Sequence, residues 1–141
     1  MKQSETVNAL KAGGIYFLGI FALGFLLGII RTLLVIPYTG AVAGVLIEMP
    51  FMLTASWFLC RRLIKRYLIV KEYKYLIIVG TSAFSWLMVT EVVFGIYLFN
   101  QTWSQYLSNF QTLHGAIGLC MQMVFGAIPV IQNLKLIMVI K

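Results

Sequence analysis

The stretch 26-LLGIIRTLLVIPYTG-40 places one arginine inside a run that is otherwise apolar enough to cross a bilayer. The apolar run begins upstream at Ala12, so it exceeds the roughly 20 residues that a transmembrane helix needs. Pro37 disfavours helix at the residue before it, and PYTG is typical of a tight turn. The stretch therefore predicts a membrane span over about 12–36 that ends at Pro37 and turns back at Gly40.

The composition of the whole chain agrees with a membrane protein. Of its 141 residues 61% are hydrophobic and only 11% are charged, and the mean hydropathy is +0.93. A soluble domain of this size needs about a quarter of its residues charged to cover its surface. We therefore expect one membrane domain over residues 1–141, with the lipid bilayer as its main partner.

Three further apolar segments are long enough to cross a bilayer, over about 40–60, 75–99 and 113–133. With the first span they predict an all-α fold, an integral membrane four-helix bundle in which the chain runs antiparallel, up-down-up-down. The segment 100-NQTWSQYLSNFQT-112 is polar and uncharged, and its aromatic residues are typical of a connection that rests on the membrane interface. Pro129 predicts a kink in the fourth span.

Basic residues gather in one connection between spans. The segment 60-CRRLIKRYLIVKEYK-74 contains six of the eleven Lys and Arg residues. Basic connections mark the cytoplasmic side of membrane proteins, so both termini are expected there as well. The lysines near the two termini agree with this orientation: Lys2, Lys11, Lys135 and Lys141. No aromatic stacking platform accompanies the basic run, so nucleic acid is not an expected partner.

The ionisable residues within the spans fall at similar depths. At about 1.5 Å of rise per residue, Arg31 lies about 9 Å, Glu48 about 12 Å and Glu91 about 13 Å below the outer ends of their spans. His114 is near the outer start of the fourth span. All four residues are therefore predicted in the outer half of the membrane.

Small residues form stripes that lead to two of these charges. In the first span Gly24, Gly28 and Arg31 follow one another at intervals of four and three residues. In the second span Gly40, Gly44 and Glu48 follow at intervals of four, so each set lies on one face of its helix. Such stripes favour close backbone packing of the first two spans against each other. The residues assigned this structural role are Gly24, Gly28, Gly40 and Gly44. In the fourth span a further stripe is predicted to face inward, and it consists of Gly115, Gly118, Gln122, Gly126 and Pro129.

Charges near the centre of a bilayer cost about 2.5–3.5 kcal/mol on insertion scales, and they normally face inward and pair. We therefore expect a buried cluster of Arg31, Glu48 and Glu91, in which either carboxylate is a possible partner of the guanidinium. The cluster has three interpretations. The first is an ion pair that fixes the helix register, and the second is a binding site for a proton, ion or small ligand. The third interpretation is a metal site that uses His114.

Pro50 lies two residues after Glu48 and removes a backbone hydrogen bond within the second span. Unpaired backbone at membrane depth is satisfied by neighbouring groups or lines a cavity. The pattern Glu-x-Pro therefore indicates either a functional break in the helix or an ordinary kink.

The chain lacks the patterns of common enzymes. It has no convergent Ser/His/Asp or Cys/His set, no glycine loop for phosphate and no pair of haem-type histidines. Cys60 and Cys120 have no zinc-type spacing and are expected to be small apolar residues of the spans. We therefore expect no catalytic residues, no metal and no cofactor.

The sequence resembles a family of small four-span bacterial membrane proteins of unknown function. The resemblance covers about residues 21–132 and depends on an arginine before a proline turn, then Glu-x-Pro, Ser-Trp and arginines at the cytoplasmic exit. The matching residues are Arg31, Pro37, Gly40, Glu48, Pro50, Ser56, Trp57, Arg61, Glu91 and Gln122. The resemblance implies the bacterial inner membrane and a shared site, but no reaction, and His114 is not part of the pattern.

Two functions remain open. The first is an accessory or scaffold protein that docks another membrane protein or lipid, with the charged cluster holding the fold. The second is a proton-coupled transporter of a small molecule or ion that acts as a homo-oligomer, since a packed bundle of four helices leaves little room for a path. For either function, the predicted binding residues are Arg31, Glu48, Glu91, His114 and Gln122.

Overall fold

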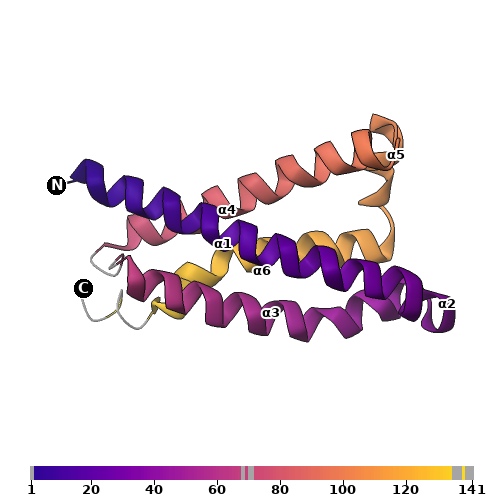
Figure 1. Cartoon of the computed structure of the whole chain (residues 1–141), viewed down its shortest axis with the longest axis horizontal. Helices are drawn as coiled ribbons and strands as arrows, with labels where there is room; N and C mark the ends of the chain where they lie inside the picture. Colours follow the sequence, from indigo (N-terminus) through magenta and orange to yellow (C-terminus); the bar gives the residue numbers. More distant parts are fainter. Residues whose placement is uncertain (1, 68, 70–71, 135–137, 139–141) are drawn as a thin grey trace.

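The fold is an all-α membrane bundle of four long helical segments, as the sequence predicts (Figure 1). It is seen in a computed structural model that describes residues 2–67, 69, 72–134 and 138. The elements in chain order are α1 (Lys2–Ile30), the π-helical turn η1 (Arg31–Val35), α2 (Ile36–Thr39), α3 (Ala41–Arg66), α4 (Tyr73–Val93), the π-helical turn η3 (Phe94–Leu98), α5 (Trp103–Asn109) and α6 (Leu113–Gln132). Four helical segments are long and apolar enough to cross a membrane: Gln3–Thr39, Ala41–Arg66, Tyr73–Leu98 and Leu113–Gln132.

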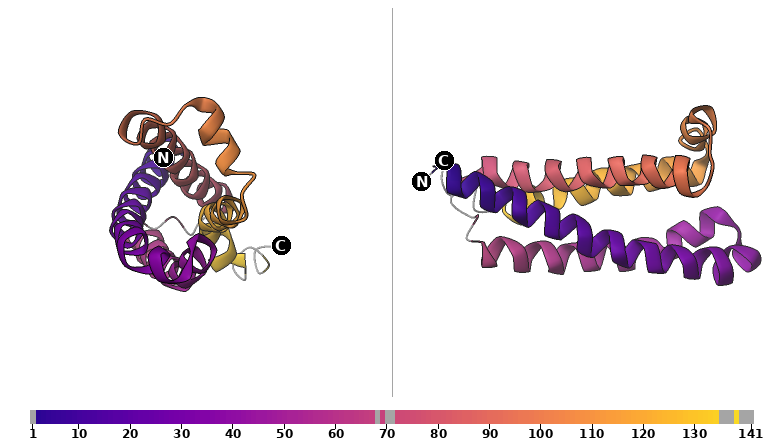
Figure 2. Two further views of the ribbon diagram at one scale, coloured as in Figure 1. Left: turned by 90° about the vertical axis from the view of Figure 1, so that its right-hand side faces the viewer. Right: turned by 45° about the horizontal axis from the view of Figure 1, so that its top comes forward.

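The four long helices form a ring in the order α1, α4, α6, α3 (Figure 2). The chain alternates in direction from each long helix to the next, as predicted. The helices α3 and α4 are consecutive in the chain but lie at opposite corners of the ring. As a result α1 and α4 are parallel neighbours, and so are α3 and α6.

The hydrophobic core fills only one half of the bundle. We call the two ends of the bundle the basic end, at the last turns of α3 with Arg61 to Arg66, and the Gly40 end. The buried apolar residues of α1 fall within 9–20, and those of α3 within 60–64, all toward the basic end. The buried residues of α4 run from Tyr75 to Leu87, and Phe125 and Ile128 complete the core from α6. Toward the Gly40 end, α1 diverges from α4 and approaches α3 (Figures 1 and 2).

Close backbone packing occurs between α4 and α6, at a glycine of the stripe predicted in the fourth span, and not between the first two spans. A Cβ atom added to Gly80 of α4 would lie 2.0 Å from the carbonyl oxygen of Gly126 of α6. At Gly24 an added Cβ would meet only the side chain of Met52, and at Gly28 only that of Arg31. The predicted backbone contact between the first two spans is therefore wrong, because these helices are held apart by side chains at this level.

Pro37 does not end the first span, which continues as helix to Thr39. Proline offers no N–H and its ring crowds the carbonyl four residues earlier. The π-helical turn at Arg31–Val35 widens the helix ahead of it, and the N–H of Ile36 donates to the carbonyl of Arg31, five residues back. The chain reverses instead at Gly40, whose φ of +85° suits glycine.

The polar connection predicted over 100–112 contains a short helix. Thr102 and Gln105 form a reciprocal capping box at the start of α5: the Gln105 N–H donates to the Thr102 hydroxyl, and the Thr102 N–H donates to the Gln105 side chain. Figure 1 shows α5 at the Gly40 end of the bundle, beyond the end of α4. Trp103 is mostly exposed there, as expected of an interfacial aromatic residue.

The second span also extends beyond its apolar segment, to Arg66. Leu63 and Ile64 pack in the core, so the helix continues past the first arginines. Pro50 and Pro129 lie inside α3 and α6 without ending either helix. Some predicted basic positions fall outside the described residues, namely Lys71, Lys135 and Lys141.

Candidate functional site

A cavity of about 860 Å³ lies between the helices toward the Gly40 end. This volume is within the range of about 300–1,000 Å³ that is typical of small-molecule sites. Leu33 and Phe99 line the cavity and are more than half exposed, so the cavity is open to its surroundings. All five predicted binding residues line this one cavity: Arg31, Glu48, Glu91, His114 and Gln122.

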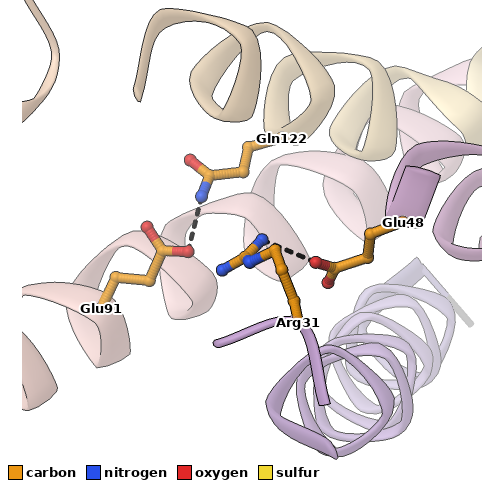
Figure 3. A network of polar contacts seen from close by, with 4 residues as sticks. All are labelled: Arg31, Glu48, Glu91 and Gln122. Carbon is orange, nitrogen blue, oxygen red and sulfur yellow. Dashed lines mark hydrogen bonds and ion pairs between the residues drawn. The ribbon is translucent and has the colours of Figure 1, made fainter. Parts of the chain in front are cut away.

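Arg31 pairs with Glu48, which settles the choice of partner that the sequence left open (Figure 3). Arg31 Nη1 donates to Glu48 Oε2 over 2.6 Å. The contact is a single hydrogen bond rather than the two-pronged pairing that a guanidinium can make. The remaining donors of Arg31 are therefore available to other groups.

Two local features place the guanidinium in the cavity. Arg31 is the first residue of η1, the widened turn that accommodates Pro37. Its aliphatic stem crosses Gly44 of α3, where an added Cβ would lie 3.0 Å from Arg31 Cγ. Gly44 therefore packs against the arginine stem, whereas Gly40 serves the chain reversal and Gly24 and Gly28 line the cavity wall.

Glu91 has a neutral partner. Gln122 Nε2 donates to Glu91 Oε1 over 2.5 Å, joining α4 to α6 (Figure 3). Within the part of the chain that the structure describes, no ion pair joins Arg31 to Glu91. The predicted triad is therefore two adjacent pairs. Arg31 and Glu48 form an ion pair, and Glu91, with its single negative charge, is hydrogen-bonded to the neutral side chain of Gln122.

The prediction that the cluster is buried is wrong. The side chains of Arg31 and Glu48 are 31% and 13% exposed, and no charged residue among those described is fully buried. The physical reason is the one-sided core: the helices separate toward the Gly40 end, and the cavity reaches the charges. An ionisable group in a span can face such a cavity instead of lipid.

Two buried polar atoms beside the cavity have no hydrogen-bond partner. They are Arg31 Nε, a donor, and Gln122 Oε1, an acceptor. Gln122 uses its amide nitrogen for Glu91, so its oxygen points away from the carboxylate (Figure 3). Buried polar groups are normally paired, so these two atoms are the unsatisfied groups of the cluster.

The floor of the cavity is a buried contact between α1 and α6. The rings of Tyr16 and Phe125 stack with centroids 4.4 Å apart, and the Tyr16 hydroxyl donates to the Phe125 carbonyl over 3.1 Å. This carbonyl lacks its usual helical donor because the fourth residue onward is Pro129. The hydroxyl therefore satisfies the acceptor that the proline leaves unpaired, and it closes the cavity toward the basic end.

Residues of the α5 connection form part of the cavity wall. Gln101, Tyr106 and Asn109 line it, and Asn109 Nδ2 donates to Gln101 Oε1 over 3.5 Å. Gly95 of η3 admits the Tyr106 ring, since an added Cβ would lie 3.1 Å from it. Burial and the nearby Glu91 carboxylate raise the pKa of Tyr106 above its usual value near 10.

His114 lies on the first turn of α6, with Nε2 3.4 Å from the Thr112 hydroxyl. No group of three or more potential metal ligands occurs among the described residues. A metal centre that uses His114 therefore has no structural support. Cys60 is buried in the core and Cys120 is exposed on the outside of α6.

Sequence reasoning missed the floor and the α5 wall of the cavity. The pattern Thr-x-x-Gln at 102–105 is a capping signature and could have predicted α5. The contact of Tyr16 with Phe125 has no local signal, because it joins residues 109 positions apart. Comparisons of the chain with protein-family models, curated proteins and solved structures find no match.

Proposed function

We propose that the protein binds a small ligand in the outer half of the membrane and carries it, the second of the two functions left open by the sequence. The observation that supports this function is the cavity itself, in which every ionisable side chain predicted within the spans meets. An ion pair that only fixes the helix register needs tight packing around it and no cavity. Here the charges instead line a volume suited to a small molecule.

The orientation is part of the proposal. The basic end, with Arg61, Arg62, Lys65 and Arg66, lies on the cytoplasmic side of a bacterial inner membrane. The cavity then opens outward, and the core with the contact between Tyr16 and Phe125 closes it from the cytoplasm. In a carrier this arrangement corresponds to an outward-open state, and movement of ligand requires that core to open or a second copy to contribute a path. No chemical transformation is included.

Gly118 offers a direct test of the cavity. It lines the cavity, and an added Cβ meets nothing within 4 Å, so a large side chain there fills open space. Gly14 of α1 also has open space but is not among the lining residues. Gly118→Phe and Gly14→Phe are therefore a matched pair of which only the first fills the cavity.

The assay records charge movement by protein in liposomes on a solid-supported membrane, under a pH gradient. Amines, amino acids, organic acids and sugars are applied in turn. We expect at least one class to produce a protein-dependent current that Gly118→Phe abolishes and Gly14→Phe retains. No current and no protein-dependent change of internal pH with any class would overturn the carrier function.

An accessory role remains the second candidate, because exposed apolar residues line the cavity mouth, among them Phe25, Leu33 and Phe99. A transmembrane helix of another protein could occupy such a surface. Native mass spectrometry after gentle purification separates the two functions. A stoichiometric partner polypeptide that Gly118→Phe displaces, together with the absence of any current, would favour the accessory role.

A further inference from the structure

With His114 counted as neutral, the formal charges of the cavity wall sum to minus one. Arg31 contributes one positive charge, and Glu48 and Glu91 contribute one negative charge each. Arg31 and Glu48 offset each other over 2.6 Å. Glu91 faces a neutral amide, so the uncompensated charge of the cavity is located at its carboxylate.

Glu91 keeps hydrogen-bonding capacity that Gln122 does not use. Gln122 donates one N–H to Glu91 Oε1, and its own oxygen points away from the carboxylate (Figure 3). An ionised carboxylate accepts hydrogen bonds at about four lone-pair positions and donates none, so Glu91 complements a ligand that carries N–H donors.

An anion has no comparable place. The guanidinium of Arg31 is already paired with Glu48, and the far side of the group points toward Glu91 and Gln122 (Figure 3). An anion at Arg31 would therefore lie between two carboxylates. The negative charges of these two carboxylates oppose an anion at this location and favour a cation.

Aromatic rings line the remainder of the cavity. Phe21 and Phe25 of α1 meet Phe94 of η3 edge to face, with centroids 5.4 and 6.1 Å apart. Phe125 forms the floor and Tyr106 the wall near α5. Such rings bury the apolar body of a ligand, and their faces attract cations.

We infer that the ligand of the cavity is a lipophilic organic cation, with its positive charge at Glu91 and its apolar body among the phenylalanines. The inference depends on the proposed ligand-binding function and assigns its chemical class.

Two nearly isosteric ions test the sign of the charge: tetraphenylphosphonium, a cation, and tetraphenylborate, an anion. Their binding to purified protein is measured by titration calorimetry in a neutral detergent, with the Gly118→Phe variant as the reference for uptake by the micelle. We expect saturable binding of tetraphenylphosphonium that Gly118→Phe removes and Gly14→Phe retains. Tetraphenylborate should give the same signal for all three proteins.

The carboxylate is tested by Glu91→Gln, with Glu72→Gln as a control that removes the same charge outside the cavity. We expect Glu91→Gln to lower the affinity for tetraphenylphosphonium at least about tenfold, and Glu72→Gln to leave it unchanged. Stability of each variant is checked by its melting temperature in the same detergent.

The outcomes separate this inference from the function on which it depends. Tighter binding of tetraphenylborate, or an affinity for the cation unchanged by Glu91→Gln, would overturn the cationic ligand. If a neutral or anionic compound then still gave currents sensitive to Gly118→Phe, the carrier function would stand. Signals of both ions that Gly118→Phe does not alter would place the ions in the micelle and overturn the inference as well.

Discussion

Replacing Tyr16 with Phe tests whether the cavity floor has the physical basis assigned to it. The substitution keeps the ring that stacks on Phe125 and removes only the hydroxyl that donates to the Phe125 carbonyl. Pro129 cannot supply the missing donor, so the carbonyl would be buried without a partner. An unsatisfied buried acceptor costs about 1–3 kcal/mol in general, and interhelical hydrogen bonds in membranes reach about 1.7 kcal/mol. We therefore expect the free energy of unfolding to fall by about 1–2 kcal/mol.

The cause is isolated by a double-mutant cycle with Pro129→Ala. Alanine restores the N–H at that position, which can donate to the Phe125 carbonyl four residues earlier. Tyr16→Phe should then cost about 1 kcal/mol less in the Pro129→Ala background than in the wild type. Unfolding is followed by tryptophan fluorescence during titration with a denaturing detergent. Tyr97→Phe is the control, because Tyr97 is 81% exposed. An equal cost of Tyr16→Phe in both backgrounds would refute the reasoning.

The remaining predictions concern packing, the ion pair and a phenol. Gly80→Ala should lower the free energy of unfolding by about 1–3 kcal/mol because the added Cβ would clash with the backbone of α6. Gly118→Ala should leave this free energy unchanged or slightly higher, because the added Cβ meets open space. Equal effects of the two substitutions in the same detergent titration would contradict the packing. Arg31→Gln should lower it by about 1–2 kcal/mol, less than the 3–5 kcal/mol of a fully buried pair because the pair is partly exposed; a loss above that range would indicate full burial. The pKa of Tyr106, followed by NMR of a ring-labelled carbon, should lie above about 10. In Glu91→Gln this pKa should fall because the carboxylate charge is removed, but it should stay above its usual value because Tyr106 is still partly buried. Because folding favours the neutral phenol, its contribution to stability is present below pH about 10 and is lost as the pH rises through the folded pKa; a pKa unchanged in Glu91→Gln would separate the two groups.

The sequence was sufficient for the architecture because span length and apolar content depend on local composition. The boundaries were less predictable where tertiary packing or a neighbouring turn decided them. Pro37 indicated an end of helix, but the widened turn beginning at Arg31 carried the helix past it. At the other end of α3, packing of Leu63 and Ile64 extended the helix into basic residues.

The candidate site was predictable in its depth but not in its geometry. Counting residues from each turn brought Arg31, Glu48 and Glu91 to one level, and they do line one cavity. The pairing depends on which helices are neighbours, and the placement of α3 opposite α4 has no signal in a single sequence. The burial of the cluster was wrongly predicted because glycine stripes in α1 and α3 suggested close packing, whereas backbone contact occurs at Gly80 and Gly126.

The central claim is that an open cavity lined by the charged residues lies within the membrane-spanning bundle. Its most direct test compares two thiols on α6 in lipid nanodiscs, using a charged methanethiosulfonate reagent that does not enter lipid. Native Cys120 is exposed but does not line the cavity, so it faces lipid, which the charged reagent does not enter. Gly118→Cys, combined with Cys120→Ser, places the thiol in the cavity two residues away. We predict rapid modification of Gly118→Cys and little of native Cys120; equal rates, or faster reaction of Cys120, would contradict the cavity.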